Sequence, residues 1–194
     1  MQREPVANAK QYGATGDGVT DDLPALQAAV NASEGKTIHV PKGVYGLSNS
    51  LLLNVEGVQF IGEAGGGYAY GFNARLDNAV TLKRIGATTT TVVIAGATDP
   101  NGTESVNKVA FKNISINGNG VALTGLIVQT IQFSEFENFT IDNVTDYGLR
   151  TGVVSNTHTG LNVCQNNTFK TFKIGMTGNG VGLHIGADRD WETS

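Results

Sequence analysis

The chain has 194 residues and a formal net charge of −4, and one elongated domain is its simplest organisation. Charged residues make up 15% of the sequence and glycine occurs 26 times, which favours turn-rich β structure and excludes helical bundles, coiled coils and acidic disordered chains. Lysine and arginine are scattered and no apolar run is long enough to span a bilayer, so neither nucleic acid nor a membrane is expected as a partner.

The predicted elements begin with a compact N-terminal unit. Three glycines within residues 12–20 allow positive φ, so this segment is predicted to be a tight, irregular loop. Thr20 or Asp21 can accept hydrogen bonds from the first turn of a helix over residues 23–30, whose apolar side chains lie on one face. A strand over residues 37–40 follows this helix and ends at a Pro-Lys-Gly turn.

This opening resembles the N-terminal cap of the pectate-lyase-like right-handed β-helix superfamily. There, a motif of the form YGAxGDGxTDD, a short helix and a VPxGxY segment open the coil, and here they occur at residues 12–22, 23–30 and 40–45. The resemblance covers roughly the first fifty residues and implies an all-β fold, a right-handed single-stranded parallel β-helix with a short helix in an N-terminal cap. Members include pectate- and rhamnogalacturonan-cleaving enzymes, mannuronan epimerases, exo-glucanases and bacteriophage tailspike depolymerases.

The three carboxylates of this opening, Asp17, Asp21 and Asp22, have two interpretations. They could form a metal or catalytic cluster, or they could satisfy backbone N–H groups of the loop and the helix start. The second interpretation is favoured because each carboxylate has backbone donors nearby. We therefore assign no metal site to them.

A repeat supports the β-helix independently of the resemblance. The pattern Phe-x-x-apolar-x-Ile begins at Phe111, Phe136 and Phe169, and a weaker copy occupies residues 55–60. Spacings of about 25 and 33 residues are typical of solenoids, whose units bury their apolar faces against their neighbours. We expect a cap with the first strands over residues 1–50 and coils over residues 51–194. Full-length relatives usually continue for more coils, so truncation at the C-terminus is expected.

One glycine-rich segment, residues 65–72, fits the repeat poorly. Its aromatic side chains Tyr68 and Tyr70 are candidate substrate-binding residues, because flat aromatic faces suit the apolar faces of pyranose rings. The alternative is that these rings pack over the end of the helix.

Cleavage of a polysaccharide sets the requirements for a catalytic site. β-Elimination needs a base and a cation that neutralises the neighbouring carboxylate, whereas hydrolysis needs paired carboxylates. Asp142, Asp146, Arg150 and His158 are the candidate catalytic residues. Asp142 follows a predicted strand, but Asn117 stands at the equivalent place in the previous repeat, which favours a turn-forming role for Asp142. No cofactor is assigned, although a lyase activity would call for Ca²⁺.

The resemblance implies a protein that binds and degrades polysaccharide, as a pectate-lyase-like lyase or a glycoside hydrolase, and a phage tailspike depolymerase is one such setting. The alternative is a non-catalytic structural or adhesin β-helix that binds host glycans, and an epimerase is a third option. The polygalacturonase signatures are not matched in order, and the Asp-Pro-His-Glu signature of mannuronan epimerases is absent, since Asp99-Pro100 precedes Asn101.

Localisation and assembly also follow from the resemblance. An extracellular or virion location is expected, although residues 1–10 lack the apolar core of a signal peptide. Tailspikes of this superfamily are usually trimers, so a homotrimer is the expected assembly for that setting. Cys164 is the sole cysteine, which rules out an intrachain disulfide, and we expect it to be a buried coil residue.

Overall fold

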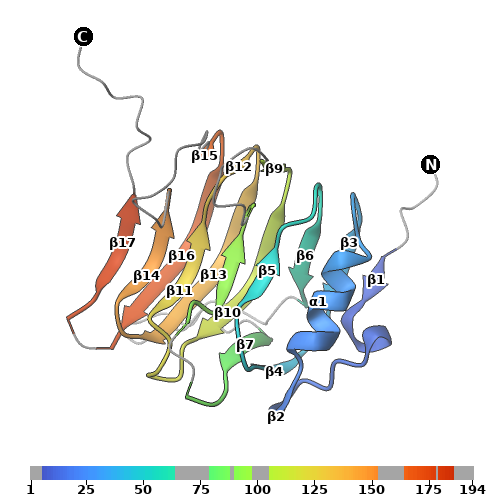
Figure 1. Ribbon diagram of the computed structural model, residues 1–194, viewed down its shortest axis with the longest axis horizontal. Coiled ribbons are helices and arrows are strands. Elements are labelled where there is room, and N and C mark those ends of the chain that lie inside the picture. The colour runs from blue at the N-terminus through green and yellow to red at the C-terminus, as the bar shows by residue number, and fades with distance from the viewer. Residues whose placement is uncertain are drawn as a thin grey trace.

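The chain folds into a right-handed parallel β-helix, as predicted (Figure 1). The computed structural model describes residues 6–63, 79–87, 90–97, 105–152, 164–177 and 179–185. Strands from successive coils stack side by side, and all of the strand pairings in these ranges are parallel. The candidate residues Tyr68, Tyr70 and His158 lie outside the described ranges.

Three parallel sheets form the walls of the coil. Sheet A consists of β1 (Ala7–Asn8), β2 (Asp17–Asp21), β3 (Thr37–Val40), β4 (Gly43–Leu47), β6 (Gln59–Gly62), β7 (Val80–Arg84), β10 (Ala110–Asn117), β13 (Glu135–Val144) and β16 (Thr168–Met176). Sheet B consists of β5 (Leu51–Leu53), β8 (Val93–Ala95), β11 (Thr124–Val128), β14 (Tyr147–Thr151) and β17 (Val181–Ile185). The short sheet consists of β9 (Val106–Asn107), β12 (Ile131–Gln132) and β15 (Cys164–Gln165).

The long strands of sheet A bend at residues in the left-handed region, and β13 has a second such residue in Asn143 near its end. Asn113 in β10, Asn138 in β13 and Thr171 in β16 have φ values of 60°, 50° and 48°. Asn138 Nδ2 donates to Asn113 Oδ1 at 2.9 Å, so the bends of two coils are joined by their side chains. Asparagine tolerates this backbone region better than most residues, which explains its use at the bend.

Phenylalanine rings stack along the interior and confirm the repeat seen in the sequence. Phe136 stacks on Phe169 with ring centroids 4.9 Å apart, and Phe139 stacks on Phe172 at 5.2 Å. The weaker copy also belongs to the repeat, because Phe60 is the register partner of Phe111 and the two rings are stacked at 6.3 Å. Stacked aromatic rings bury large apolar areas and fix the register between coils.

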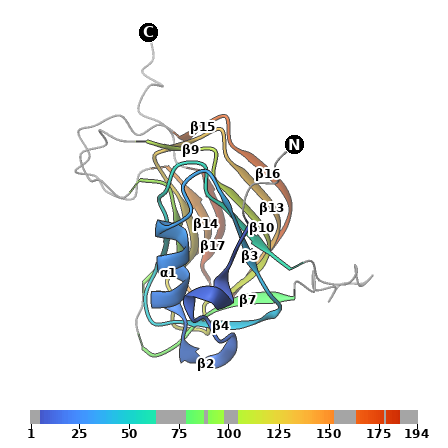
Figure 2. The ribbon, with the colours of Figure 1, turned by 90° about the vertical axis from the view of Figure 1, so that its right-hand side faces the viewer.

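Helix α1 (Leu23–Asn31) covers the first edge of sheet B (Figure 2). The side-chain amide of Gln27 accepts from Leu52 N–H at 3.0 Å and donates to Leu52 C=O at 3.1 Å. Gln27 thereby replaces the hydrogen bonds of a missing neighbouring strand at the middle residue of β5. An edge covered in this way offers fewer free backbone groups to another sheet.

The N-terminal prediction was partly wrong. The 3₁₀ helix η1 (Ala9–Tyr12) ends at the first residue of the expected loop over residues 12–20, and β2 occupies the second half of that loop, because Asp17 pairs with Val44 and Asp21 with Gly46. Gly16 does adopt a positive φ of 66°, and a Cβ there would lie 3.0 Å from the buried Tyr45 ring. Glycine therefore lets the turn press against an aromatic core residue.

Candidate functional site

The buried carboxylate of the N-terminal cap has a structural role. Asp22 is 1% exposed and accepts hydrogen bonds from Thr15 N–H at 2.6 Å, Thr15 Oγ1 at 3.0 Å and Gly16 N–H at 3.1 Å. All of these donors belong to the turn between η1 and β2. Since its oxygens are occupied by the chain's own donors, Asp22 holds the cap together.

The other two cap carboxylates are occupied in the same way. Hydrogen bonds from Thr20 and Val19 lower the pKa of Asp17 to about 2. Partial burial acts to raise the pKa of Asp21, but hydrogen bonds from Ser48 and Leu23 outweigh it and lower the pKa. These carboxylates accept hydrogen bonds from the loop and the helix start, as the capping interpretation predicts.

The outer face of sheet A carries a network of opposite charges. Lys112 Nζ lies 2.5 Å from Glu135 Oε2 and 3.2 Å from Glu137 Oε2, and Lys170 Nζ lies 2.9 Å from Glu135 Oε1. These side chains stand on β10, β13 and β16, so the network runs across three coils. Beside it, Thr140 Oγ1 donates to Ser115 Oγ at 2.8 Å.

This network rules out Glu135 as a proton donor near neutral pH. Hydrogen bonds from Lys112 and then Lys170 lower the pKa of Glu135 to about 2, so the carboxyl group stays ionised. A general acid needs a pKa close to the working pH. Glu135 and its lysine partners are therefore suited to joining coils.

Asp142 projects from the same face near its edge. It lies inside β13 and not after the strand, which corrects the sequence-based boundary, and its Cα partner on the previous coil is Asn117. On the following coil stands Gly175, where a Cβ would lie 2.5 Å from Asp142 Oδ1. Glycine at position 175 therefore leaves the space that the Asp142 carboxylate occupies.

The remaining predicted acid and cation lie further along the chain. Asp146 occupies the turn after β13, where its backbone N–H donates to Leu123 O and its backbone carbonyl accepts from Val181 N–H. Arg150 stands on β14 of sheet B. Within the described residues, no hydrogen bond or ion pair joins Asp142, Asp146 and Arg150. The three residues lie on β13, in the turn after it and on β14, so the structure does not bring them together as one site.

A compact cluster surrounds Arg150 on the outer face of sheet B. The guanidinium carbon lies 5.1 Å from the centroid of the Tyr147 ring, and the His184 ring meets Tyr147 edge-on at 5.5 Å. Arg150 and His184 are register partners on the neighbouring strands β14 and β17. Only the parallel register brings these residues together, so no local sequence pattern indicates the cluster.

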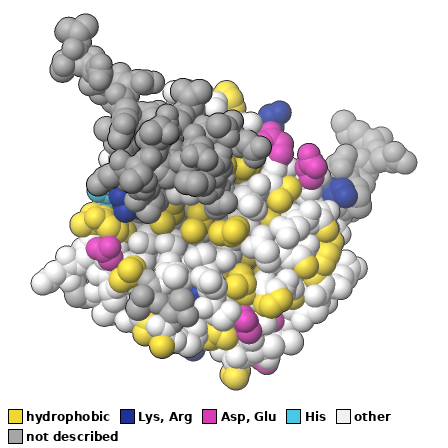
Figure 3. All heavy atoms as spheres, viewed as in Figure 1, with side chains coloured by type: hydrophobic (Ala, Val, Ile, Leu, Met, Phe, Trp, Pro, Cys, Tyr) yellow, Lys and Arg dark blue, Asp and Glu magenta, His cyan; other side chains and the backbone are white. Residues whose placement is uncertain are grey.

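The side of the molecule that carries sheet B and α1 faces the reader in Figure 3. Rows of hydrophobic side chains cross this side, and charged side chains are sparse among them. The charge network of sheet A thus contrasts with a largely uncharged sheet B. Against that background a tyrosine, an arginine and a histidine in contact form a distinctive group.

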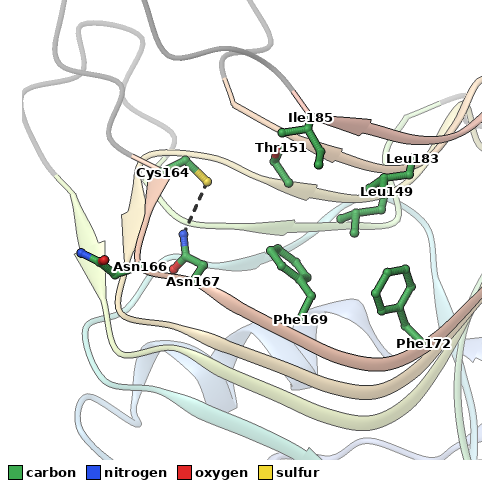
Figure 4. Close-up of a pocket in the computed structure, with 9 residues that line it drawn as sticks. All are labelled: Leu149, Thr151, Cys164, Asn166, Asn167, Phe169, Phe172, Leu183 and Ile185. Carbon is green, nitrogen blue, oxygen red and sulfur yellow. Dashed lines mark hydrogen bonds between the residues drawn. The ribbon is translucent and has the colours of Figure 1, made fainter. Parts of the chain in front are cut away.

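An apolar cavity of about 380 Å³ lies at the last described coil (Figure 4). Its walls include Phe169 and Phe172 from β16 and Leu183 and Ile185 from β17. Phe172 is 38% exposed and Ile185 is 73% exposed. These are the positions that form the core in earlier coils, so the cavity continues the core and offers no charged group for chemistry.

Cys164 contributes to the wall of this cavity and is only half-buried, against the expectation of a buried residue. Asn167 Nδ2 donates to its sulfur at 3.5 Å. Its partial exposure follows from its place in the last described coil.

Two further properties concern the described part of the chain alone. Within it, no group of three or more His, Cys, Asp or Glu side chains is placed to hold a metal ion. No helix in that part of the chain combines the length and the apolar character needed to cross a membrane.

Comparison with known proteins gives a consistent result. A profile of the family described as "Rhamnogalacturonase A/epimerase, pectate lyase-like" matches residues 6–187. Mannuronan C5-epimerase AlgE3 of Azotobacter vinelandii is 41% identical over 66 residues, which cover 29% of this chain and 4% of the relative. The capsule K30/K69-specific Depolymerase 1 of Klebsiella phage K5-2 is 62% identical over 29 residues, which cover 15% of this chain and 4% of the relative.

A solved structure extends the likeness to most of the fold. The mannuronan C-5 epimerase AlgE4 A-module of Azotobacter vinelandii superposes with a TM-score of 0.60 at 18% identity, covering 92% of this chain and 53% of that chain. At this identity the likeness establishes the β-helix architecture. The chain spans a small part of the curated relatives and about half of this structure.

Proposed function

The chain belongs to the rhamnogalacturonase A/epimerase, pectate-lyase-like family, and from this premise we propose that it binds and modifies a polysaccharide. Family membership carries this proposal, because relatives named as a mannuronan epimerase and a capsule depolymerase both act on polysaccharides. A fold alone does not define an activity, so the chemistry has to come from side chains on the outer faces of the coil.

The architecture suits an extended polymer. Strands of successive coils repeat in register, so equivalent side chains recur in rows along the outer face of each sheet. A linear polysaccharide also repeats along its length. A row of side chains on several coils can therefore contact several sugar units, which a single loop cannot do.

For the chemistry we propose Asp142, Asp146, Arg150 and His158 as catalytic residues. Gly175 leaves room for the Asp142 carboxylate at the outer edge of sheet A, and Arg150 offers a cation that could neutralise a uronate. The proposal includes a lyase or a glycoside hydrolase as the reaction type, with Ca²⁺ in the lyase case. Tyr68 and Tyr70 are proposed to bind sugar rings.

The proposed setting is extracellular or on a virion, with a homotrimer in the tailspike case. The capsule-specific phage depolymerase among the relatives supports this setting. The competing function is glycan binding by a non-catalytic β-helix. It is favoured by the separate positions of Asp142, Asp146 and Arg150, which no hydrogen bond or ion pair joins within the described residues.

An activity screen separates these functions. The purified protein is incubated with acidic and neutral polysaccharides from bacteria and plants, while the ultraviolet absorbance of unsaturated uronates and the formation of reducing ends are followed. New absorbance identifies a lyase, and reducing ends alone identify a hydrolase. Binding without cleavage supports the glycan-holding β-helix when the uronate composition of the polymer is also unchanged, since an epimerase alters that composition without cleavage. The absence of both binding and cleavage contradicts the proposed function.

A further inference from the structure

We propose that Tyr147, Arg150 and His184 form a binding site for the carboxylate or sulfate group of an acidic polysaccharide on the outer face of sheet B. This inference rests on the proposed polysaccharide function and specifies the class of polymer. It also assigns Arg150 to substrate binding together with two residues that no sequence signature indicated.

The first argument is the geometry of the cluster. The register pairs Arg150 directly with His184 on the neighbouring strand, and parallel strands place such partners about 4.8 Å apart. Tyr147 contacts both side chains through its ring. The ring thus holds two nitrogen-rich groups side by side, a spacing that two oxygens of one carboxylate or sulfate can bridge.

The second argument is the hydrogen-bonding capacity that the protein leaves unused. Arg150 Nε and His184 Nδ1 are buried and have no hydrogen-bond partner. Among the described residues, no carboxylate forms an ion pair with Arg150 or His184. Guanidinium groups bind carboxylate and sulfate-like oxygens through charge-assisted hydrogen bonds, and because Arg150 and His184 are only partly buried, their outer edges are accessible to an anionic ligand.

The third argument is that the fold does not require charge at these positions. The same register row carries Leu52, Ile94 and Ile127 on the three earlier coils of sheet B. Apolar residues therefore satisfy the coil at this row. The change to Arg150 and His184 on the last two described coils is better explained by a ligand than by folding.

The substitution Arg150→Ile tests this site with little risk to the fold, since isoleucine occupies two equivalent positions. His184→Gln removes the second nitrogen-rich group, and Tyr147→Phe keeps the ring and serves as a mild change. Lys83→Gln is the matched control, because it removes a cation from the outer face of sheet A, away from the cluster.

Affinity electrophoresis measures dissociation constants for alginate, polygalacturonate and iota-carrageenan, with carboxyl-reduced or desulfated forms of each polymer as neutral counterparts. We expect binding to at least one acidic polymer and not to its neutral form, with affinity reduced about ten- to hundredfold by Arg150→Ile and unchanged by Lys83→Gln. Thermal unfolding confirms that each variant is folded.

Three results would overturn the inference: equal binding of acidic and neutral forms, equal loss with Lys83→Gln, or no binding of any acidic polymer. The proposed polysaccharide function would still stand after any of these results if a neutral polysaccharide is bound or cleaved. Conversely, the activity screen can show no product while the protein still binds acidic polymers in a way that Arg150→Ile abolishes. That result would support the anion site and reject the modifying activity.

Discussion

Charged side chains form ion pairs on the outer face of sheet A, whereas Arg150 on the outer face of sheet B forms none with the described residues. On sheet A, Lys112 and Lys170 are matched by Glu135 and Glu137 in one network across three coils. On sheet B, the Arg150 guanidinium lies over the Tyr147 ring and forms no ion pair with a described residue. Charges that satisfy one another strengthen the stack, whereas charges that lack a partner are available to a ligand.

The largest expected effect concerns catalysis at the edge of sheet A. Replacing Asp142 and Asp146 together by asparagine removes both proposed carboxylates while preserving side-chain size. Turnover of the polysaccharide that the activity screen identifies should fall by about a hundredfold or more. Glu137→Gln, which lies in the charge network, should retain activity. Unchanged turnover in a folded double variant would reject the catalytic assignment of this pair.

The next effect concerns the internal bonding of sheet A. Asn138→Ala places an ordinary side chain in the left-handed region and deletes the hydrogen bond to Asn113. We expect the free energy of unfolding to fall by about 2 kcal/mol in chemical denaturation. Asn138→Gly accepts the same backbone region, so it should lose about half as much. An equal loss for both variants would show that the backbone conformation contributes nothing.

A smaller effect is expected from the charge network. Glu135 has an ordinary pKa of 4.5 that is held at about 2 in the fold, so its contribution to stability is present above pH 4.5 and disappears as the pH falls through 2. Because the network is partly exposed, Glu135→Gln should lower the unfolding free energy at pH 7 by only about 0.5–1 kcal/mol. Thermal unfolding from pH 7 to pH 2 checks this, and a difference that does not shrink as the pH falls toward 2 would contradict it.

The smallest effect is expected on sheet B. His184→Gln removes no ion pair or hydrogen bond within the described structure, so the unfolding free energy should change by less than about 0.5 kcal/mol. Comparing the loss of unfolding free energy for His184→Gln with that for Glu135→Gln under the same conditions shows how differently the two faces contribute to stability. A loss larger than that of Glu135→Gln would mean that the cluster on sheet B stabilises the fold.

Much of the architecture could be predicted from the sequence because it depends on local patterns. Alternating apolar residues around Ile114 and Ile141 and the repeated phenylalanines point inward and stack, as the strand period of two requires. The capping roles of Asp17 and Asp22 were also predictable, since their donors lie within a few residues along the chain.

The candidate site was less predictable because it depends on register. Arg150 and His184 are far apart in sequence and become neighbours only when β17 pairs with β14. The ion pairs of Glu135 likewise join residues on three different coils. Periodicity identifies which residues face outward, but the number of residues in each intervening loop decides which of them meet.

The most direct test of polymer binding on sheet B compares a histidine of sheet A with a histidine of sheet B. His39 stands on β3 of sheet A and His184 on β17 of sheet B, and imidazole resonances report local binding. NMR spectra of the protein are recorded while the polysaccharide identified by the screen is added. The account predicts that the His184 resonances shift and saturate while those of His39 stay in place. A shift of His39 alone, or of neither histidine despite binding, would contradict the claim that sheet B holds the polymer.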